Sequence, residues 1–189
     1  MFEYLIEKDI ELFLFLNNLG TKQWDGFWMF ITNKYSFIPL YLFLLYLTFR
    51  QFGTKKTMFT LLVVAGLILL TDQTSNLFKY GFERLRPCHN LAIQDYVRLV
   101  KDRCGGLYAF FSGHASNTMG VAIFFGLLLK SSYKILPVLL IIWGVFVAYS
   151  RIYIGVHFPL DILTGMLFGL VYGTLSYKML QLLWRRFTN

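Results

Sequence analysis

Two histidines in this sequence stand beside residue types that can support nucleophilic and acid–base chemistry. His157 precedes Asp161 by four residues, and Pro159 between them fits the first turn of a helix. Asp161 would then lie one turn inside that helix, where its carboxylate can hold one imidazole nitrogen and leave the other free to attack. Arg151 lies just upstream. The alternative interpretation of this segment is a structural ion pair between Arg151 and Asp161.

The second histidine belongs to Ser112-Gly113-His114, which comes directly before the apolar run Ala115–Leu129. A helix N-terminus offers unpaired backbone N–H groups and a favourable dipole to an anion, and glycine lets the backbone approach a ligand closely. His114 can donate a proton to a leaving oxygen, because the reference pKa of histidine is near neutrality. The alternative is that Ser112 is an ordinary N-cap beside an interfacial histidine.

A third segment supplies positive charge. Lys79 and Arg86 are seven residues apart, two helical turns, so both project from one helix face before Pro87 ends the helix. Two cations on one face suit a multiply charged anion such as phosphate. The alternative is that Lys79 pairs with Glu83, while Arg84 and Arg86 bind lipid headgroups without specificity.

The elements that must position these segments are predicted to be membrane helices. Hydrophobic residues make up 57% of the 189 residues, above the roughly one half that is usual in soluble proteins. Five charge-free runs recur along the chain: Tyr35–Phe49, Thr57–Thr71, Ala115–Leu129, Ile135–Ser150 and Ile162–Tyr177. Five such runs are too many to bury inside so small a protein. We predict an all-α integral membrane protein with a bundle of five or six transmembrane helices.

The distribution of charge orients this bundle. The polar segments Arg50–Lys56, Lys130–Lys134 and Lys178–Asn189 alternate with the apolar runs and carry the whole formal charge of +8 without one acid. The positive-inside rule places such segments in the cytoplasm, so we expect a cytoplasmic C-terminus and an outward-facing site in a bacterial inner membrane. The basic balance therefore indicates a membrane and not a nucleic-acid partner.

The N-terminal region 1–33 is predicted to lie at the membrane surface. It begins with acids, lacks a basic leader and has no small-residue cleavage site, so we do not expect a signal peptide. Its apolar residues recur at helical spacing and predict an interfacial amphipathic helix: Phe2, Ile6, Ile10 and Phe13. With the five runs that follow, the chain is expected to form one membrane domain over residues 1–189.

The longest stretch without helical pattern, residues 87–111, is predicted to be an outer loop. It holds Cys88 and Cys104, and an oxidising compartment favours a disulfide between them, with two reduced thiols as the alternative. His89 in the same loop is expected to be solvated. Asp72 directly follows the second apolar run, within the predicted membrane helix, and is expected to bond polar groups on neighbouring helices.

Together, the three segments resemble the signature of a known family. Lys79-x6-Arg86-Pro87, Ser112-Gly113-His114 and Ser150-Arg151-x5-His157-x3-Asp161 are similar, in order and spacing, to the three-part motif of the type 2 phosphatidic acid phosphatase and haloperoxidase superfamily. Phe111 stands where that family commonly has proline, a departure that removes no chemical group.

The resemblance implies a phosphohistidine mechanism that uses neither metal nor cofactor. His157 would attack phosphorus while Asp161 holds its ring, and His114 would protonate the departing oxygen and then activate water. The phosphoryl oxygens would be bound by the remaining motif residues: Lys79, Arg86, Ser112, Gly113 and Arg151.

The resemblance also implies a phosphorylated membrane lipid as substrate. Undecaprenyl diphosphate ranks first, followed by the 1-phosphate of lipid A, phosphatidylglycerol phosphate and phosphatidic acid. A lipid-to-lipid phosphotransferase is a second enzyme hypothesis. The membrane helices argue against a vanadium haloperoxidase. Outside the enzymes stand a lipid transporter, which would be expected to have more helices and internal repeats, and a lipid-binding protein, which should have lost a catalytic residue.

Overall fold

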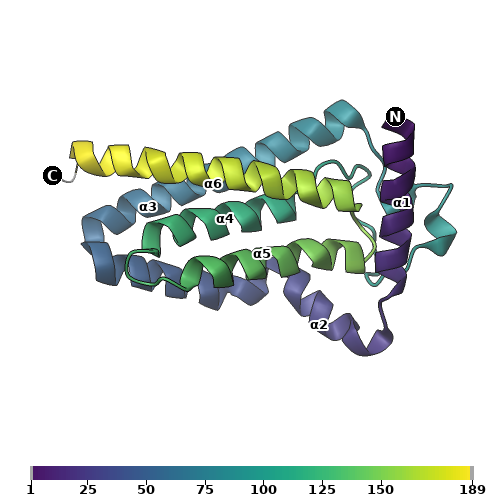
Figure 1. The fold of residues 1–189 in the computed structure, drawn as a ribbon, viewed down its shortest axis with the longest axis horizontal. Helices are drawn as coiled ribbons and strands as arrows, with labels where there is room; N and C mark the ends of the chain where they lie inside the picture. The colour runs from purple at the N-terminus through teal and green to yellow at the C-terminus, as the bar shows by residue number, and fades with distance from the viewer. Residues whose placement is uncertain (1, 188–189) are drawn as a thin grey trace.

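The computed structural model describes residues 2–187, with side chains from residue 3 onward. Phe2, the first member of the predicted apolar stripe, is therefore described by its backbone alone. Helices dominate and no β-strand occurs over that range (Figure 1). The elements in chain order are α1 Phe2–Asn18, α2 Lys22–Thr32, η1 Lys34–Phe37, α3 Ile38–Phe82, η2 Pro87–His89, η3 Gln94–Tyr96, α4 Gly113–Leu129, α5 Leu136–Tyr153 and α6 Pro159–Phe187.

Helix α3 is two antiparallel limbs joined at a glycine. Its 45 residues would span about 68 Å as one straight helix, more than twice the hydrocarbon thickness of a bilayer. Gly53 leaves the helical conformation with φ of 75°, a backbone geometry that glycine adopts without steric cost. The chain doubles back there (Figure 1), so the two predicted spans on either side of Arg50–Lys56 run in opposite directions.

Three helical segments are long and apolar enough to cross a membrane: Lys34–Phe82, Leu136–Tyr153 and Pro159–Phe187. Helix α4 is equally apolar but has only 17 residues. The chain is thus an all-helical membrane protein. Counting the two limbs of α3 separately and including α4 would give five spans, a number that stays a prediction.

The central helix α4 packs against α6 with the two backbones almost in contact. A Cβ atom added at Gly169 would lie 2.5 Å from the carbonyl oxygen of Ser116, and one at Gly173 would lie 2.5 Å from that of Gly120. Glycines spaced by four residues form one helix face, the arrangement that lets membrane helices approach closely. This contact fixes the start of α6 relative to the start of α4.

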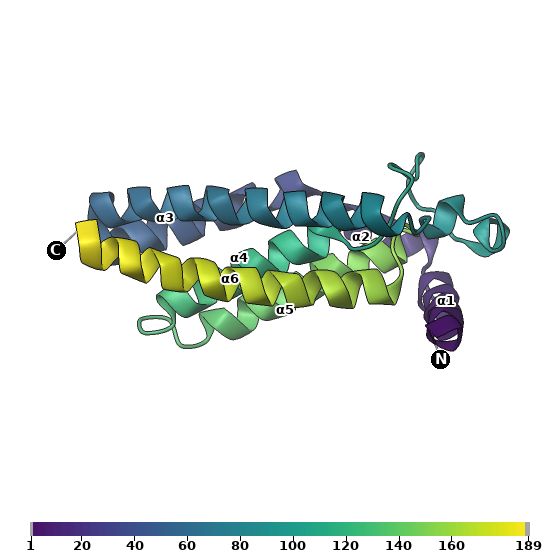
Figure 2. The ribbon, with the colours of Figure 1, turned by 90° about the horizontal axis from the view of Figure 1, so that it is seen from above.

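Helix α1 lies across one end of the bundle, as Figures 1 and 2 show from two directions. Its buried face consists of Asp9, Phe13 and Asn17, whereas the sequence pattern predicts the apolar stripe through Ile6, Ile10 and Phe13. The reason is that α1 covers the end of α5 and the start of α6, where backbone groups need polar partners. The side chain of Asn17, for instance, donates hydrogen bonds to two carbonyl oxygens at the end of α5.

The two ends of the bundle differ in character. The Gly53 turn, the connection between α4 and α5, and the end of α6 lie together at one end (Figure 1). The loop after α3, the starts of α4 and α6, and the end of α5 meet at the other end, beside α1 (Figures 1 and 2). All three sequence motifs therefore lie at the end opposite the basic segments.

Candidate active site

Four helix ends and one loop bring the predicted site residues together. Lys79 lies in the last turn of the second α3 limb, Arg86 in the loop, His114 in the first turn of α4 and Arg151 in the last turn of α5. His157 stands in the short connection to α6. The two histidines lie within electrostatic range of each other, of Arg151 and of Lys79. The motifs, distant in sequence, thus share one cluster.

The carboxylate of Asp161 is the most heavily bonded group of this cluster. Its Oδ2 accepts a hydrogen bond of 2.8 Å from the backbone nitrogen of Phe158 and lies 3.4 Å from Nδ1 of His157. Its Oδ1 accepts a bond of 2.9 Å from Arg84, and the side chain is fully buried. The predicted contact between His157 and Asp161 is present, at a long distance for a hydrogen bond. The ion pair of Asp161 is made with Arg84 and not with Arg151.

The carboxylate of Asp161 contacts Nδ1 of His157, and the imidazole ring also makes a hydrogen bond to the backbone of Ala109. Burial, and then the positive charge of Arg151, lower the pKa of His157 below its ordinary value. The imidazole is therefore neutral at neutral pH, which is the state that a nucleophile requires.

Two buried donors in the cluster have no partner among the described residues. Arg151 bonds the hydroxyl of Thr32 through Nη1 at 2.5 Å, but its Nε is unpaired. Ser112 occupies the N-cap position of α4 without making a capping bond, and its hydroxyl is also unpaired. Buried donors without partners are costly and rare. The arrangement favours an anion-binding role over the ordinary N-cap alternative for Ser112.

Backbone contacts clamp the second motif between α3 and α6. The nitrogen of Ser112 donates a hydrogen bond of 3.0 Å to the carbonyl oxygen of Asp161. The hydroxyl of Ser75 donates one of 3.0 Å to the carbonyl oxygen of Phe111. A Cβ atom at Gly113 would lie 3.1 Å from that hydroxyl, so a larger residue would push α4 away from α3. Phe111 itself is buried against the ring of Phe168.

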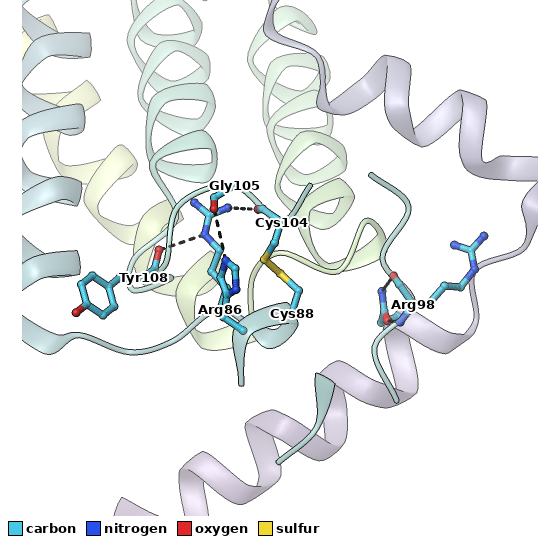
Figure 3. Close-up of a disulfide and its surroundings, with 8 residues drawn as sticks. Arg86, Cys88, Arg98, Cys104, Gly105 and Tyr108 are labelled. Atoms are coloured by element: carbon cyan, nitrogen blue, oxygen red, sulfur yellow. Dashed lines mark hydrogen bonds between the residues drawn. A yellow bond between two sulfur atoms is a disulfide. The ribbon is translucent and has the colours of Figure 1, made fainter. Parts of the chain in front are cut away.

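The prediction that Lys79 and Arg86 share one helix face is wrong, because α3 already ends at Phe82, where Glu83 turns left-handed. Arg86 lies in the loop that follows, and the backbone of that loop holds its side chain. The guanidinium donates to the carbonyl oxygen of Tyr108 at 3.2 Å and to that of Cys104 at 2.9 Å. Cys104 forms a disulfide with Cys88, next but one to Arg86 in the chain (Figure 3). His89 contacts the carbonyl oxygen of Gly105 at 3.5 Å. The disulfide thus closes the loop that positions Arg86.

Lys79 makes no ion pair with Glu83 within residues 3–187; it lies within electrostatic range of two cations and two carboxylates: Arg86, Arg151, Asp72 and Asp161. Half-buried cations that face one another favour a common anionic ligand over separate structural roles. Asp72 lies about two helical turns before Lys79 on the same helix face. It accepts a hydrogen bond of 2.7 Å from Asn117 of α4. That contact agrees with the structural role expected for Asp72.

Sequence reasoning missed three charged residues at this end of the bundle. Arg84 joins Asp161 to Asp9 of α1, and was assigned only to lipid headgroups. Lys101 lies in the disulfide-closed loop, where burial and the nearby guanidiniums of Arg151 and Arg86 lower its pKa. The signal for Asp9 was its position: an acid three residues after Ile6 falls on the apolar side of the helix.

Over residues 2–187, no group of three or more histidine, cysteine, aspartate or glutamate side chains is placed so that it could hold a metal ion. The cluster itself contains two histidines, a buried carboxylate and several cations. Such a set can bind a phosphoryl group, transfer it to an imidazole and move one proton.

Comparison with known proteins identifies a family. The family model described as "PAP2 superfamily" matches residues 57–185. The lipid A 4'-phosphatase of Porphyromonas gingivalis is 37% identical over 93% of this chain and 74% of its own length. The lipid A 4'-phosphatase of Bacteroides thetaiotaomicron is 34% identical over 94% of this chain and 79% of its own length. An undecaprenyl-diphosphatase of Sulfolobus acidocaldarius is 32% identical over 85% of this chain and 73% of its own length.

Solved structures agree with this family. The crystal structure of Aquifex aeolicus LpxE superposes with a TM-score of 0.67 at 27% identity, covering 89% of this chain and 93% of that one. The family model covers more than half of the chain and includes every motif residue of the cluster. The chain therefore belongs to the PAP2 superfamily and is, like these relatives, a phosphatase.

Proposed function

We propose that the protein hydrolyses a phosphate ester of a membrane lipid through a phosphohistidine formed at His157. The observation that carries this proposal is the pair of buried, unpartnered donors on Arg151 and Ser112. They lie in the same cluster as an imidazole held by a buried carboxylate. A phosphoryl group bound by both donors would lie in the same cluster as the His157 ring that is proposed to attack phosphorus.

In the first step, Nε2 of His157 attacks phosphorus in line and a nitrogen–phosphorus bond forms. The bond from phosphorus to the lipid oxygen breaks, and that oxygen takes a proton from His114. The phosphorylated ring carries positive charge, which the carboxylate of Asp161 stabilises across its contact with Nδ1. Lys79, Arg86 and Arg151 oppose the negative charge on the phosphoryl oxygens.

In the second step, the now neutral His114 takes a proton from water while the water oxygen bonds to phosphorus. The nitrogen–phosphorus bond breaks, and its electron pair returns to Nε2 of His157. Inorganic phosphate leaves and both histidines regain their starting states. His114 therefore acts as acid and then as base, as one group must in a two-step displacement.

The relatives favour a phosphorylated glycolipid of the lipid A type as substrate, since two lipid A 4'-phosphatases match most of this chain. This order differs from the sequence-based ranking, which places undecaprenyl diphosphate first and the 1-phosphate of lipid A second. Undecaprenyl diphosphate stays the second candidate because an undecaprenyl-diphosphatase is 32% identical. Both are amphiphiles that would present phosphate at the end of a membrane bundle.

The proposed setting is a bacterial inner membrane crossed by five helices in a single domain, with α1 lying in the outer interface. The basic segments around Gly53, between α4 and α5, and at the end of α6 share one end of the bundle. The positive-inside rule assigns that end to the cytoplasm. The cluster would then face the periplasm or the exterior, and the C-terminus the cytoplasm.

The test is phosphate release by detergent-purified protein in EDTA from four lipids: lipid A, undecaprenyl diphosphate, phosphatidylglycerol phosphate and phosphatidic acid. We expect release from lipid A to be fastest and His157→Ala to abolish it. Acid-labile labelled protein after rapid quenching would identify the phosphohistidine. Release that persists in His157→Ala would contradict the mechanism. Label that moves to a second lipid instead of water would favour the phosphotransferase alternative.

A further inference from the structure

Asp9 lies on the N-terminal helix, outside every motif of the family signature, yet its side chain is only 2% exposed. Its two carboxylate oxygens have different partners. Oδ2 accepts a bond of 2.6 Å from Arg84, and Oδ1 accepts one of 2.8 Å from the backbone nitrogen of Leu160. Asp9 therefore binds the first turn of α6 and a partly buried cation at once.

Arg84 transmits this contact to the reactive pair. Its Nη1 donates to Oδ1 of Asp161 at 2.9 Å while its Nη2 donates to Asp9. The guanidinium also lies over the ring of Phe158, 4.1 Å from its centre. Since Asp161 faces Nδ1 of His157, one continuous chain of contacts runs from Asp9 through Arg84 and Asp161 to His157.

The charges along this chain matter as much as the geometry. If Asp9 were absent, Arg84 would pair with Asp161 alone. The charge of Asp161 would then be largely neutralised, and the carboxylate would stabilise a positively charged ring poorly. Asp9 and Asp161 share the guanidinium of Arg84, so the three groups carry a net negative charge next to the imidazole when both carboxylates are ionised. The groups that face His157 from the other elements are three cations and a second imidazole: Arg151, Arg86, Lys79 and His114.

We propose that Asp9 is a positioning residue for the His157–Asp161 pair and acts through Arg84. The proposal rests on the function proposed above and assigns α1 a part in the reaction. Asp9 touches no substrate. It sets the orientation and the charge of the carboxylate that holds the nucleophile.

The experiment compares Asp9→Asn with Glu7→Gln in the purified protein. Asparagine keeps the acceptor for Leu160 but removes the charge that Arg84 shares, whereas Glu7 is exposed on the same helix. We expect kcat for Asp9→Asn to fall between about tenfold and 100-fold, with KM within about twofold. The acid limb of the kcat/KM profile should move to lower pH, because losing a negative charge lowers the pKa of a histidine. Glu7→Gln should match the wild type.

A double-mutant cycle tests the route. If Asp9 acts through Arg84, Asp9→Asn should add little to the loss caused by Arg84→Gln. Additive losses would overturn the proposal. So would a wild-type pH profile in folded Asp9→Asn protein, since a merely structural role would lower the folded fraction and leave the profile in place.

Two further results keep the tests separate. If Asp9→Asn gives no folded protein, the same profile is measured on Asp9→Glu, which keeps the charge. There we expect a lowered kcat with the acid limb at the wild-type pH, and an unchanged kcat would overturn the proposal. Failure of the proposed function itself would show differently, as a wild type that releases no phosphate or a His157→Ala variant that still does.

Discussion

The backbone nitrogen of Ser112 donates a hydrogen bond of 3.0 Å to the carbonyl oxygen of Asp161. This bond joins the start of α4 to the start of α6, and so joins the proposed phosphate-binding motif to the proposed nucleophile motif through main chain alone. Side-chain substitution cannot remove it. A change in the spacing of the two helices can break this bond, so we expect the packing of α4 on α6 to determine activity.

Gly165→Ala should disturb that spacing. The added Cβ would lie 2.6 Å from the carbonyl oxygen of Ser112, so α6 must shift away from α4 or the chain must strain. We expect unfolding to become easier by about 1–3 kcal/mol and kcat to fall by roughly tenfold or more. Thermal unfolding and phosphate release in detergent measure the two effects.

Gly66→Ala is the matched control, because a Cβ at that helical position meets no atom within 4 Å. It should leave kcat unchanged and keep or slightly raise stability. If both substitutions affected kcat equally, close packing at Gly165 would not be the cause.

Arg151→Lys should lose most of the activity while keeping the charge. Lysine cannot reproduce both the bond to Thr32 and the free Nε donor. We expect kcat/KM to fall roughly 100-fold, in the range seen on removal of one donor to a transition state. Thr32→Val, which frees Nη1 without touching Nε, should cost only about fivefold. Steady-state kinetics on the preferred lipid would compare the two, and equal losses would contradict a special role for Nε.

Breaking the disulfide should weaken substrate binding. The bond between Cys88 and Cys104 closes a loop with a sequence separation of 16, and the carbonyl oxygen of Cys104 holds Arg86. We expect Cys88→Ser with Cys104→Ser to raise KM and to lower the free energy of unfolding by about 3 kcal/mol. Reductant should reproduce the higher KM in the wild type and leave the double variant unaffected. A reductant effect on that variant would point to another target.

Lys101 should make phosphate binding sensitive to alkaline pH. Burial, followed by the charges of Arg151 and Arg86, lowers the pKa of Lys101, so its charge is lost at a lower pH than that of a free lysine. Inhibition by inorganic phosphate, followed from neutral pH to about pH 10, should weaken as Lys101 deprotonates. Lys101→Arg should shift that weakening to higher pH, and Lys101→Ala should bind roughly tenfold more weakly at neutral pH. Identical profiles for all three proteins would show that Lys101 does not contact the anion.

The parts of the site that could be predicted are those governed by helix periodicity. The spacing of His157 and Asp161 places both at the start of one helix whatever surrounds it, and the structure has Pro159 as the first residue of α6. The alternation of apolar runs and basic segments likewise predicts which helix ends share a side. Both inferences use only contacts between near neighbours or the general physics of the bilayer.

The parts that escaped prediction depend on contacts across long sequence separations. Arg84 meets Asp161 and Asp9 at separations of 77 and 75 residues, and no local pattern encodes such a meeting. The same holds for α1, whose periodicity predicts an apolar stripe. Its buried face is set by the unpaired backbone groups at the start of α6 and the end of α5, which exist only once the bundle has formed.

The disulfide ties activity to the route by which the chain matures. A reducing cytosol keeps thiols apart, so during synthesis the loop that holds Arg86 stays open and the anion site incomplete. In the proposed orientation, the loop becomes ordered only after it has crossed the membrane into an oxidising compartment. The enzyme would then bind phosphorylated lipids and soluble phosphates more weakly on the side where it is made than in the compartment where the disulfide has formed.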